Sequence, residues 1–280
     1  MTERSIIQAH RRTAISHVAI GNVTTPVARP LPKRLLGVWA HPDDECYLSA
    51  GLMARVVAAG GHVRIVCATR GELGTSDPTE SGTERFGRSR ILELESSLDV
   101  LGVHDVHVLG LPDGGCADAD DVTMAAVVAD HVTDLGADTV ITFGPDGITG
   151  HADHAAVSRW TTAAAHADVE LLYATMTNDF AHRHRALHDT IGVFGDLPGG
   201  RPRSVARDRV ALQVALDHGE LIRKRRALHE HGSQTGSLAA LMGEDTYFSW
   251  WREECFRRPA DVEIRSDQAL PGRIAVGVGA

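Results

Sequence analysis

The sequence predicts an α/β fold in which a mostly parallel sheet carries helices on both of its faces. Three observations support this prediction. Short apolar runs alternate along the chain with longer segments of helical periodicity. Glycine residues stand where several of the helical segments end. Clusters of polar residues follow the apolar runs, at the positions where loops leave the strands of such a sheet.

Five apolar runs predict the strands of the sheet, in order along the chain. They are residues 35–40, 62–69, 105–111, 138–144 and 170–176. The helical segments between them are residues 49–61, 85–101, 120–135 and a segment that begins near 151. Because each helix carries the chain back to the starting edge, successive strands run parallel through right-handed crossovers. The pattern is Rossmann-like, and ligands are expected beyond the carboxyl ends of the strands.

The alternating pattern weakens after residue 180. We predict a helix over about 204–230, followed by a tail that contains the aromatic run 246–251. That run favours core packing or a contact between subunits, with a platform for a sugar ring as the alternative, so a homo-oligomer is one expectation. The expected division is an N-terminal arm (1–33), a main domain (34–235) and a C-terminal tail (236–280) packed on the same domain.

Length and charge exclude several classes of function. A chain of 280 residues suits one large α/β domain. The formal net charge of -9 repels nucleic acid, so we expect no nucleic-acid partner. The sequence has no run of about 20 apolar residues, the length that crosses a bilayer, so we expect no membrane span.

Cysteine usage favours a reducing compartment. The four cysteines lack the paired spacing of a disulfide framework or a Cys-type zinc site: Cys46, Cys67, Cys116 and Cys255. Arg11 and Arg12 suggest an export signal, but neither a long apolar stretch nor a small-residue cleavage site follows them. We therefore expect a cytoplasmic protein.

The first chemical signal is the cluster His41-Pro42-Asp43-Asp44-Glu45, directly after the first predicted strand. Three carboxylates this close repel one another unless a cation lies among them. His41 and Asp44 have the spacing to reach one metal ion from a strand end and an opening helix turn. Asp43 would then lie beside the site as a general base. The alternative is that the acidic residues only stabilise a helix N-terminus.

The second signal is the glycine-rich loop 144–150, which follows the fourth predicted strand and leads to His151, Asp153 and His154. The two histidines are three residues apart, so they share one face of a helical turn. One of them would complete a three-ligand metal site, and the other would stabilise an oxyanion or protonate a leaving amine. Asp153 would hold that second imidazole in its tautomer. The alternative is a pair of surface histidines.

Together the two clusters make the sequence similar to the LmbE-like/PIG-L family of zinc N-deacetylases. That family includes deacetylases of mycothiol, bacillithiol and glycosyl-phosphatidylinositol-precursor biosynthesis. The resemblance covers roughly residues 34–234, and its most specific motifs are AHPDDE (40–45) and GHADH (150–154). Weaker matches, in the family's order, are ATRGELGT (68–75), the Arg90–Glu93 stretch followed by LGV (101–103), and His231–Gln234.

The resemblance implies a role for each matching position. It implies a zinc site with three ligands: His41, Asp44 and His154. Asp43 would be the general base, and His151 would stabilise the oxyanion with Asp153 orienting it. Arg90 and Asp113 would contact substrate hydroxyls or a neighbouring phosphate. Zn²⁺ is the expected cofactor, and Fe²⁺ or Co²⁺ also suits such a donor set.

Two positions depart from the family's pattern, and the resemblance does not fix the roles of three further residues. Thr149 stands where some members have a tyrosine that takes part in catalysis, and Ala152 stands where many have proline. Glu72 is expected to order its loop. His231 and Gln234 would either line the cleft or cap a helix.

The expected function is removal of an N-acetyl group from an N-acetylglucosamine-like small-molecule conjugate by a zinc-dependent hydrolase. One alternative is an amidase that releases a larger N-acyl group, and loops 76–84 and 178–204 would set its pocket size. Another is a catalytically silent nucleotide- or sugar-binding protein. A nucleotide site needs a glycine-rich phosphate loop after the first strand, where this sequence has acidic residues instead.

Overall fold

The computed structural model of the chain describes residues 30–195, 197, 201 and 203–260. The predicted N-terminal arm therefore lies outside the described residues, apart from residues 30–33. The boundaries expected at 33 and 235 stay a prediction. Among the described helices, none is both long and apolar enough to cross a membrane.

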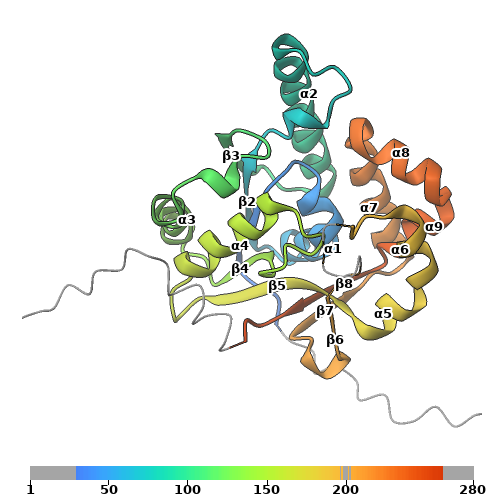
Figure 1. Cartoon of the computed structure of the whole chain (residues 1–280). Coiled ribbons are helices and arrows are strands. Elements are labelled where there is room, and N and C mark those ends of the chain that lie inside the picture. The colour runs from blue at the N-terminus through green and yellow to red at the C-terminus, as the bar shows by residue number, and fades with distance from the viewer. Residues whose placement is uncertain (1–29, 196, 198–200, 202, 261–280) are drawn as a thin grey trace, which may run out of the picture. The chain divides into compact units, whose positions relative to one another are not determined.

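A single mixed sheet forms the centre of the described part (Figure 1). Its strands are β1 (Arg34–Trp39), β2 (His62–Thr69), β3 (Asp105–Leu111), β4 (Thr139–Phe143), β5 (Glu170–Thr177), β6 (Ser204–Val205), β7 (Leu212–Ala215) and β8 (Glu253–Arg257). The strand order is β3-β2-β1-β4-β5-β8-β7, and β6 pairs with the end of β5. The first five strands are parallel, whereas β8 runs antiparallel to β5 and β7. The predicted α/β, mostly parallel fold is confirmed.

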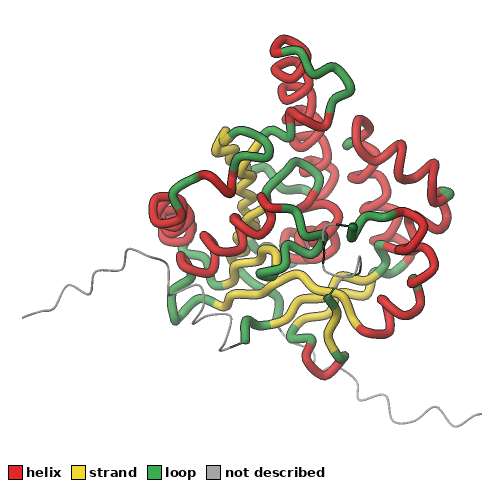
Figure 2. Tube along the Cα trace, viewed as in Figure 1, coloured by secondary structure: helices red, strands yellow, loops and turns green. Residues whose placement is uncertain are grey.

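Two groups of helices pack around this sheet (Figures 1 and 2). The helices are α1 (Asp44–Ala58), α2 (Glu80–Leu101), α3 (Asp121–Leu135), α4 (Ala152–Ala164), α5 (Asn178–Arg183), α6 (Arg185–Ile191), α7 (His218–Glu230), α8 (Gly232–Met242) and α9 (Glu244–Trp250). α1, α2 and α7 contact one another, and α3 contacts α4. Residues 35–39 of the central strand β1 are all buried, because helices cover the sheet there on both sides.

Local sequence explains where several elements begin and end. The Thr79 side chain accepts a hydrogen bond from the Gly82 amide and starts α2 five residues earlier than predicted. Gly102 ends α2 and Gly136 ends α3, each in the left-handed conformation that glycine adopts without strain. The loop after β2 contains a short 3-10 turn at Glu72–Gly74.

The predicted continuous helix over 204–230 is wrong. The segment instead contains β6, a 3-10 turn (Arg207–Arg209), β7 and only then α7. Helix α7 begins at a reciprocal capping box, in which Asp217 and Glu220 each accept a hydrogen bond from the other's backbone amide. The preceding residues form ladder hydrogen bonds with β8, a partner about 40 residues further along the chain. Pairing with that distant strand outweighs the local helical pattern.

The aromatic run at 246–251 lies mostly in α9 and belongs to the core. Tyr247, Phe248 and Trp250 are buried. The following strand β8, which the sequence did not predict, places residues of the expected tail inside the same sheet. The four cysteines are buried free thiols.

Candidate active site

The polar clusters that follow the parallel strands meet at one edge of the sheet. They are residues 41–45 after β1, 70–74 after β2, 112–116 after β3 and 144–154 after β4. The carboxyl ends of these strands share an edge because the strands are parallel and adjacent. Segments more than 100 residues apart in sequence therefore supply side chains to one site.

Three side chains from the two motifs converge on one point. The Nδ1 atom of His41 lies 3.1 Å from Nε2 of His154. Nε2 of His154 lies 3.5 Å from Oδ1 of Asp44, and Nδ1 of His41 lies 3.6 Å from Oδ2 of Asp44. All three side chains are almost fully shielded from solvent. The residues predicted as metal ligands thus lie together, with their donor atoms facing one another.

The opposite ring nitrogen of each histidine is held by a hydrogen-bond acceptor. Nε2 of His41 lies 3.1 Å from Oδ1 of Asp113 and 3.3 Å from Oδ2 of Asp153. Nδ1 of His154 lies 2.9 Å from the carbonyl oxygen of Gly147. Such partners fix the tautomer and aim the free lone pair of each ring at the shared point, as in metal sites.

This donor set fits a divalent metal ion. Zinc bonds to imidazole nitrogen and carboxylate oxygen at about 2.0–2.2 Å, so tetrahedral ligands lie about 3.3 Å apart. The three pairs of donor atoms described above lie 3.1, 3.5 and 3.6 Å apart. A ring nitrogen of His151 also lies within 4.8 Å of ring nitrogens of both His41 and His154.

The charges of the site also favour a cation. Burial alone would lower the pKa of His41, but hydrogen bonds with Asp113, Asp153 and Asp44 raise it well above the usual value. Burial would raise the pKa of Asp44, yet His154 and His41 hold it below its usual range. Burial lowers the pKa of His154, which keeps this imidazole neutral and its lone pair available. The carboxylates of Asp44, Asp113 and Asp153 thus surround the two imidazoles, an arrangement that suits a bound cation.

Asp43, the predicted general base, has an unusual backbone conformation. Its φ of 112° lies in the region that residues other than glycine rarely adopt. Its amide donates to Oε2 of Glu45 at 3.0 Å, and its Oδ2 accepts from Arg90 at 3.1 Å. Burial raises the pKa of Asp43 to about 7, against the opposing effect of Arg90. A carboxylate with a pKa near neutrality suits proton transfer at physiological pH.

Arg90 binds the first motif from inside the protein. Its guanidinium is buried and donates to the carbonyl oxygens of Pro42 and Gly71 as well as to Asp43. This differs from the expected substrate contact, because both terminal nitrogens of the guanidinium donate to acceptors inside the protein. The arginine side chain instead stabilises the strained turn at Asp43 through these hydrogen bonds.

His231 stands at the C-cap of α7 and the N-cap of α8, one of its two expected positions, and its side chain contacts the first motif. Its Nε2 lies 3.1 Å from Oε1 of Glu45, and both side chains are at most 1% exposed. The other oxygen of Glu45 accepts the Asp43 amide. Residue 231 is thereby connected through one carboxylate to the backbone of Asp43, the predicted general base.

Asp153 and Asp113 both approach His41. The Asp153 carboxylate accepts from the amides of Gly114 and Cys116 at 2.8 and 3.0 Å, in addition to its contact with His41. Asp153 was expected to orient His151, but Nδ1 of His151 accepts from the Asp153 backbone amide at 3.2 Å instead. Asp113 accepts from the Leu73 amide at 2.9 Å. The carboxylates of residues 113 and 153 thus hold the first predicted ligand.

One buried ion pair near the site was missed by the sequence reasoning. Nζ of Lys224 on α7 lies 2.8 Å from Oε1 of Glu254 on β8. The Glu254 carboxylate also accepts from the amides of Gly51 and Leu52 on α1. A side chain at position 51 would collide with Leu216 and approach that carboxylate, so glycine permits the contact. The signal of this arrangement in the sequence is Gly51, a glycine inside a helical segment.

An apolar cavity of about 160 Å³ opens beside the three predicted ligands. Asp43, Asp44 and His154 line one part of it. Most of the remaining wall is apolar and includes Leu48, Phe143, Met176, Phe194, Trp250 and Trp251. A small ligand in this cavity would therefore meet carboxylates and imidazole on one side and hydrocarbon on the other.

Comparison with known proteins agrees with this geometry. The model of the family described as PIG-L, GlcNAc-PI de-N-acetylase, matches residues 36–165. A Mycobacterium (strain KMS) protein named 1D-myo-inositol 2-acetamido-2-deoxy-alpha-D-glucopyranoside deacetylase is 36% identical over 171 residues. That alignment covers 54% of this chain and 56% of the relative, about half of each.

A relative of the same name from Mycolicibacterium gilvum (strain PYR-GCK) aligns over more of its length. It is 31% identical over 233 residues, which cover 72% of this chain and 80% of that protein. The solved structure of the N,N'-diacetylchitobiose deacetylase from Pyrococcus horikoshii has the same fold, with a TM-score of 0.56 at 19% identity. That match covers 86% of this chain and 88% of the other. The chain therefore belongs to the PIG-L family, the family of GlcNAc-PI de-N-acetylases.

Proposed function

We propose that this chain is a zinc-dependent hydrolase that removes an N-acetyl group from an N-acetylglucosamine-like small-molecule conjugate. The observation that carries the proposal is the convergence of His41, Asp44 and His154 at 3.1–3.6 Å beside the Asp43 carboxylate. The two relatives reported above are named as deacetylases of an acetamido sugar joined to inositol. Their names support a substrate of the same chemical class.

We propose that His41, Asp44 and His154 hold the metal, with Fe²⁺ or Co²⁺ as alternatives to zinc. When bound, such an ion polarises an amide carbonyl and activates water. The protein keeps the three donors in place through the contacts of His41 with Asp113 and Asp153 and of His154 with the Gly147 carbonyl. These contacts support a site that is assembled before substrate arrives.

Asp43 would take the proton from the attacking water. Burial raises the pKa of Asp43 to about 7, and a cation bound nearby would favour the ionised carboxylate, which can accept a proton. Once protonated, the same carboxyl group can return that proton to the leaving amine. Arg90 and Glu45 fix its position, so little rearrangement accompanies either transfer.

His151 would stabilise the oxyanion that develops on the amide. Its ring packs edge-on against the ring of His41, with centroids 4.8 Å apart, at the rim of the metal cluster. The backbone amide of Asp153 donates to its Nδ1, which leaves Nε2–H as the donor for an incoming carbonyl oxygen. Asp113, at the same rim, stays the candidate contact for substrate hydroxyls, and we assign Arg90 the orientation of Asp43.

The test is acetate release from N-acetylglucosamine conjugates by the purified protein, measured together with its metal content. We expect acetate release that a chelator abolishes and that added Zn²⁺ restores. Stoichiometric bound metal without amide hydrolysis on any conjugate would contradict the proposal.

A second candidate reaction is release of a larger N-acyl group, and the apolar cavity favours it. A volume of about 160 Å³ exceeds the space that a single acetyl methyl group fills, and aromatic side chains line it. Glucosamine carrying N-acetyl, N-butanoyl and N-hexanoyl groups distinguishes the two reactions. Values of kcat/KM that fall with chain length support the deacetylase, whereas values that rise support the larger acyl group.

A further inference from the structure

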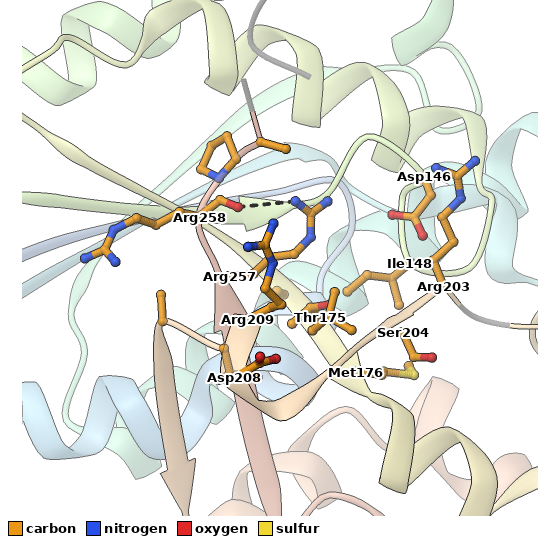
Figure 3. Close-up of a pocket in the computed structure, with 16 residues that line it drawn as sticks. Asp146, Ile148, Thr175, Met176, Arg203, Ser204, Asp208, Arg209, Arg257 and Arg258 are labelled. Atoms are coloured by element: carbon orange, nitrogen blue, oxygen red, sulfur yellow. Dashed lines mark hydrogen bonds between the residues drawn. The ribbon is translucent and has the colours of Figure 1, made fainter. Parts of the chain in front are cut away.

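Two features of the chain beyond the family match at residues 36–165 border the proposed active site. One is a pocket of about 540 Å³ beside the loop after β4 (Figure 3). Two arginines of its wall, Arg203 and Arg209, are matched in number by Asp146 and Asp208 of the same wall, so their charges indicate no particular ligand. The other feature is His231, between α7 and α8, whose side chain contacts the first motif itself.

Asp43 depends on its surroundings because its backbone is strained. Its φ of 112° is costly for a residue other than glycine, and such a conformation persists only where surrounding contacts fix it. Asp43 stands at the N-cap of α1, but its side chain forms no capping hydrogen bond with the described backbone of that helix. The contacts that hold this residue therefore decide where the carboxylate of the proposed general base lies.

Glu45 provides one of these contacts from the first turn of α1. Its Oε2 accepts a hydrogen bond from the Asp43 amide at 3.0 Å, and Glu45 is fully buried. The bonded amide belongs to the strained residue, so the hydrogen bond acts directly on the backbone conformation at position 43. A shift of the Glu45 carboxylate would therefore release the turn.

His231 holds that carboxylate from the opposite side. Its Nε2 lies 3.1 Å from the second oxygen of Glu45, Oε1. The other ring nitrogen, Nδ1, is buried and has no hydrogen-bond partner among the described residues. Burying an unpaired polar atom costs stability, so an apolar side chain would serve packing better at this position. The contact with Glu45 is thus the interaction that a histidine provides here.

Helix α2 supports Asp43 from two directions. Arg90 on this helix donates directly to Oδ2 of Asp43 at 3.1 Å. Glu93, three residues further along, accepts from the amide and the hydroxyl of Ser233 at 3.0 and 2.7 Å. Because Ser233 lies two residues after His231, these hydrogen bonds fix the turn that carries the histidine. The imidazole is therefore held against Glu45 by a junction that is itself anchored on α2.

We propose that His231 is a positioning residue, which keeps the Asp43 carboxylate aligned for proton transfer by holding Glu45. The inference rests on the proposed function, in which Asp43 is the general base. His231 is not among the residues that line the apolar cavity, and its contact with the first motif is through Glu45. Its removal should therefore affect the chemical step and leave the binding of metal and substrate intact.

Kinetics of acetate release test this separation. His231→Leu should lower kcat per bound metal ion by about 10- to 100-fold, the effect of a misplaced catalytic group, with KM and metal content unchanged. His231→Gln, whose amide can still donate to Glu45, should recover most of that loss. His229→Leu, at an exposed histidine two residues away, is the control. An unchanged kcat in His231→Leu would overturn the proposal, as would a glutamine variant no more active than the leucine variant.

A double-mutant cycle tests whether His231 acts through Glu45. If it does, adding His231→Leu to Glu45→Leu should lower kcat no further than Glu45→Leu alone, because the connection is already broken. Losses that multiply in the double variant would contradict the proposed connection.

Crystal structures of the unmodified chain and of His231→Leu give a readout that does not depend on hydrolysis. We expect the variant to lose the hydrogen bond between Glu45 and the Asp43 amide, and the Asp43 carboxylate to move by about 1 Å or more. A turn that moves in this way supports the role of His231 even if no conjugate is hydrolysed. An unchanged turn at Asp43 would overturn it even if the chain proves to be a deacetylase.

Discussion

Two buried clusters of charge contact the first helix, and they differ in whether their charges balance. Lys224 and Glu254 form an ion pair that is 1% exposed, and backbone groups of α1 satisfy both side chains further. At the N-terminus of the same helix, Asp44, Asp113 and Asp153 surround His41 and His154, and within the described part of the chain none of these three carboxylates forms an ion pair with lysine or arginine. The balanced cluster is complete within the protein, whereas the unbalanced one has the charge and geometry that suit a bound cation.

The comparison explains why similar residue types have different roles. In the balanced cluster each charged atom contacts a partner of opposite charge or a backbone dipole. A bound ligand would therefore add no stabilisation there. In the other cluster the donor atoms face one another at distances that suit a shared metal. Changing one side chain in each cluster should therefore affect different properties: metal content in one, stability of the fold in the other.

The largest effect is expected for His154→Ala. Loss of one of the three proposed ligands should remove the metal and lower acetate release by about 10⁴-fold, because both carbonyl polarisation and water activation would depend on the ion. The melting temperature should change little by comparison. Metal analysis and an acetate assay check this, with His104→Ala, at an exposed histidine, as the matched control. A variant that keeps stoichiometric metal would remove residue 154 from the ligand set.

A substitution in the balanced cluster should lower the stability of the fold. Lys224→Met leaves Glu254 as a buried, unpaired carboxylate, so the free energy of unfolding should fall by about 3–5 kcal/mol. Urea denaturation measures this, and Lys33→Met, at the other lysine of the chain, is an exposed control. Adding Glu254→Gln to the first variant removes the uncompensated charge and should recover part of the loss. A double variant less stable than the single one would show that the pair is not the source of the effect.

Asp43→Asn should separate chemistry from metal binding. Asparagine keeps the size and can still accept a hydrogen bond from Arg90, but it cannot take a proton. We expect acetate release to fall by at least about 100-fold while bound metal and KM stay near their original values. Asp99→Asn, at an exposed carboxylate, is the control. Loss of metal in the Asp43 variant would make this residue a ligand rather than a base.

The sequence predicted the structure most accurately where the local pattern and the global fold agree. Strands β2 and β3 have the predicted bounds, because segments rich in apolar residues there lie between glycine or proline residues that favour turns: Gly61 and Gly71 around β2, and Gly102 and Pro112 around β3. Gly102 and Gly136 ended the predicted helices because the αL conformation at their positions favours glycine. The meeting of the His41 and His154 motifs followed from parallel strands alone.

The same reasoning could not assign partners within the site. Asp153 contacts His41 because the turn after β3 brings the amides of Gly114 and Cys116 to its carboxylate, a contact between distant segments. Arg90 turns inward because carbonyl oxygens of two separate loops accept from it. Strand β7 depends on its partner β8, so no local period could reveal it. Each of these outcomes is decided by tertiary contacts.

His188 lies in a third buried environment, and changing this residue has the smallest expected effect. His188 is surrounded by aromatic rings rather than carboxylates, with the rings of Phe194 and Trp250 centred 4.9 and 5.4 Å away. Burial lowers the pKa of His188 to about 4, with a further lowering by His184 and an opposing effect of Asp189. The pKa of His41, beside three carboxylates, moves in the opposite direction.

This shift predicts how stability depends on pH. The unfolded chain protonates His188 below its ordinary pKa of about 6.5, whereas the folded chain resists protonation until about pH 4. The contribution is therefore fully present above pH 6.5 and decreases as pH falls toward 4, by up to about 3 kcal/mol. His188→Phe keeps the apolar contacts and cannot titrate. Urea denaturation between pH 7 and 4 should show a smaller decline for this variant, and equal declines in both proteins would contradict the assignment of a neutral, buried imidazole at 188.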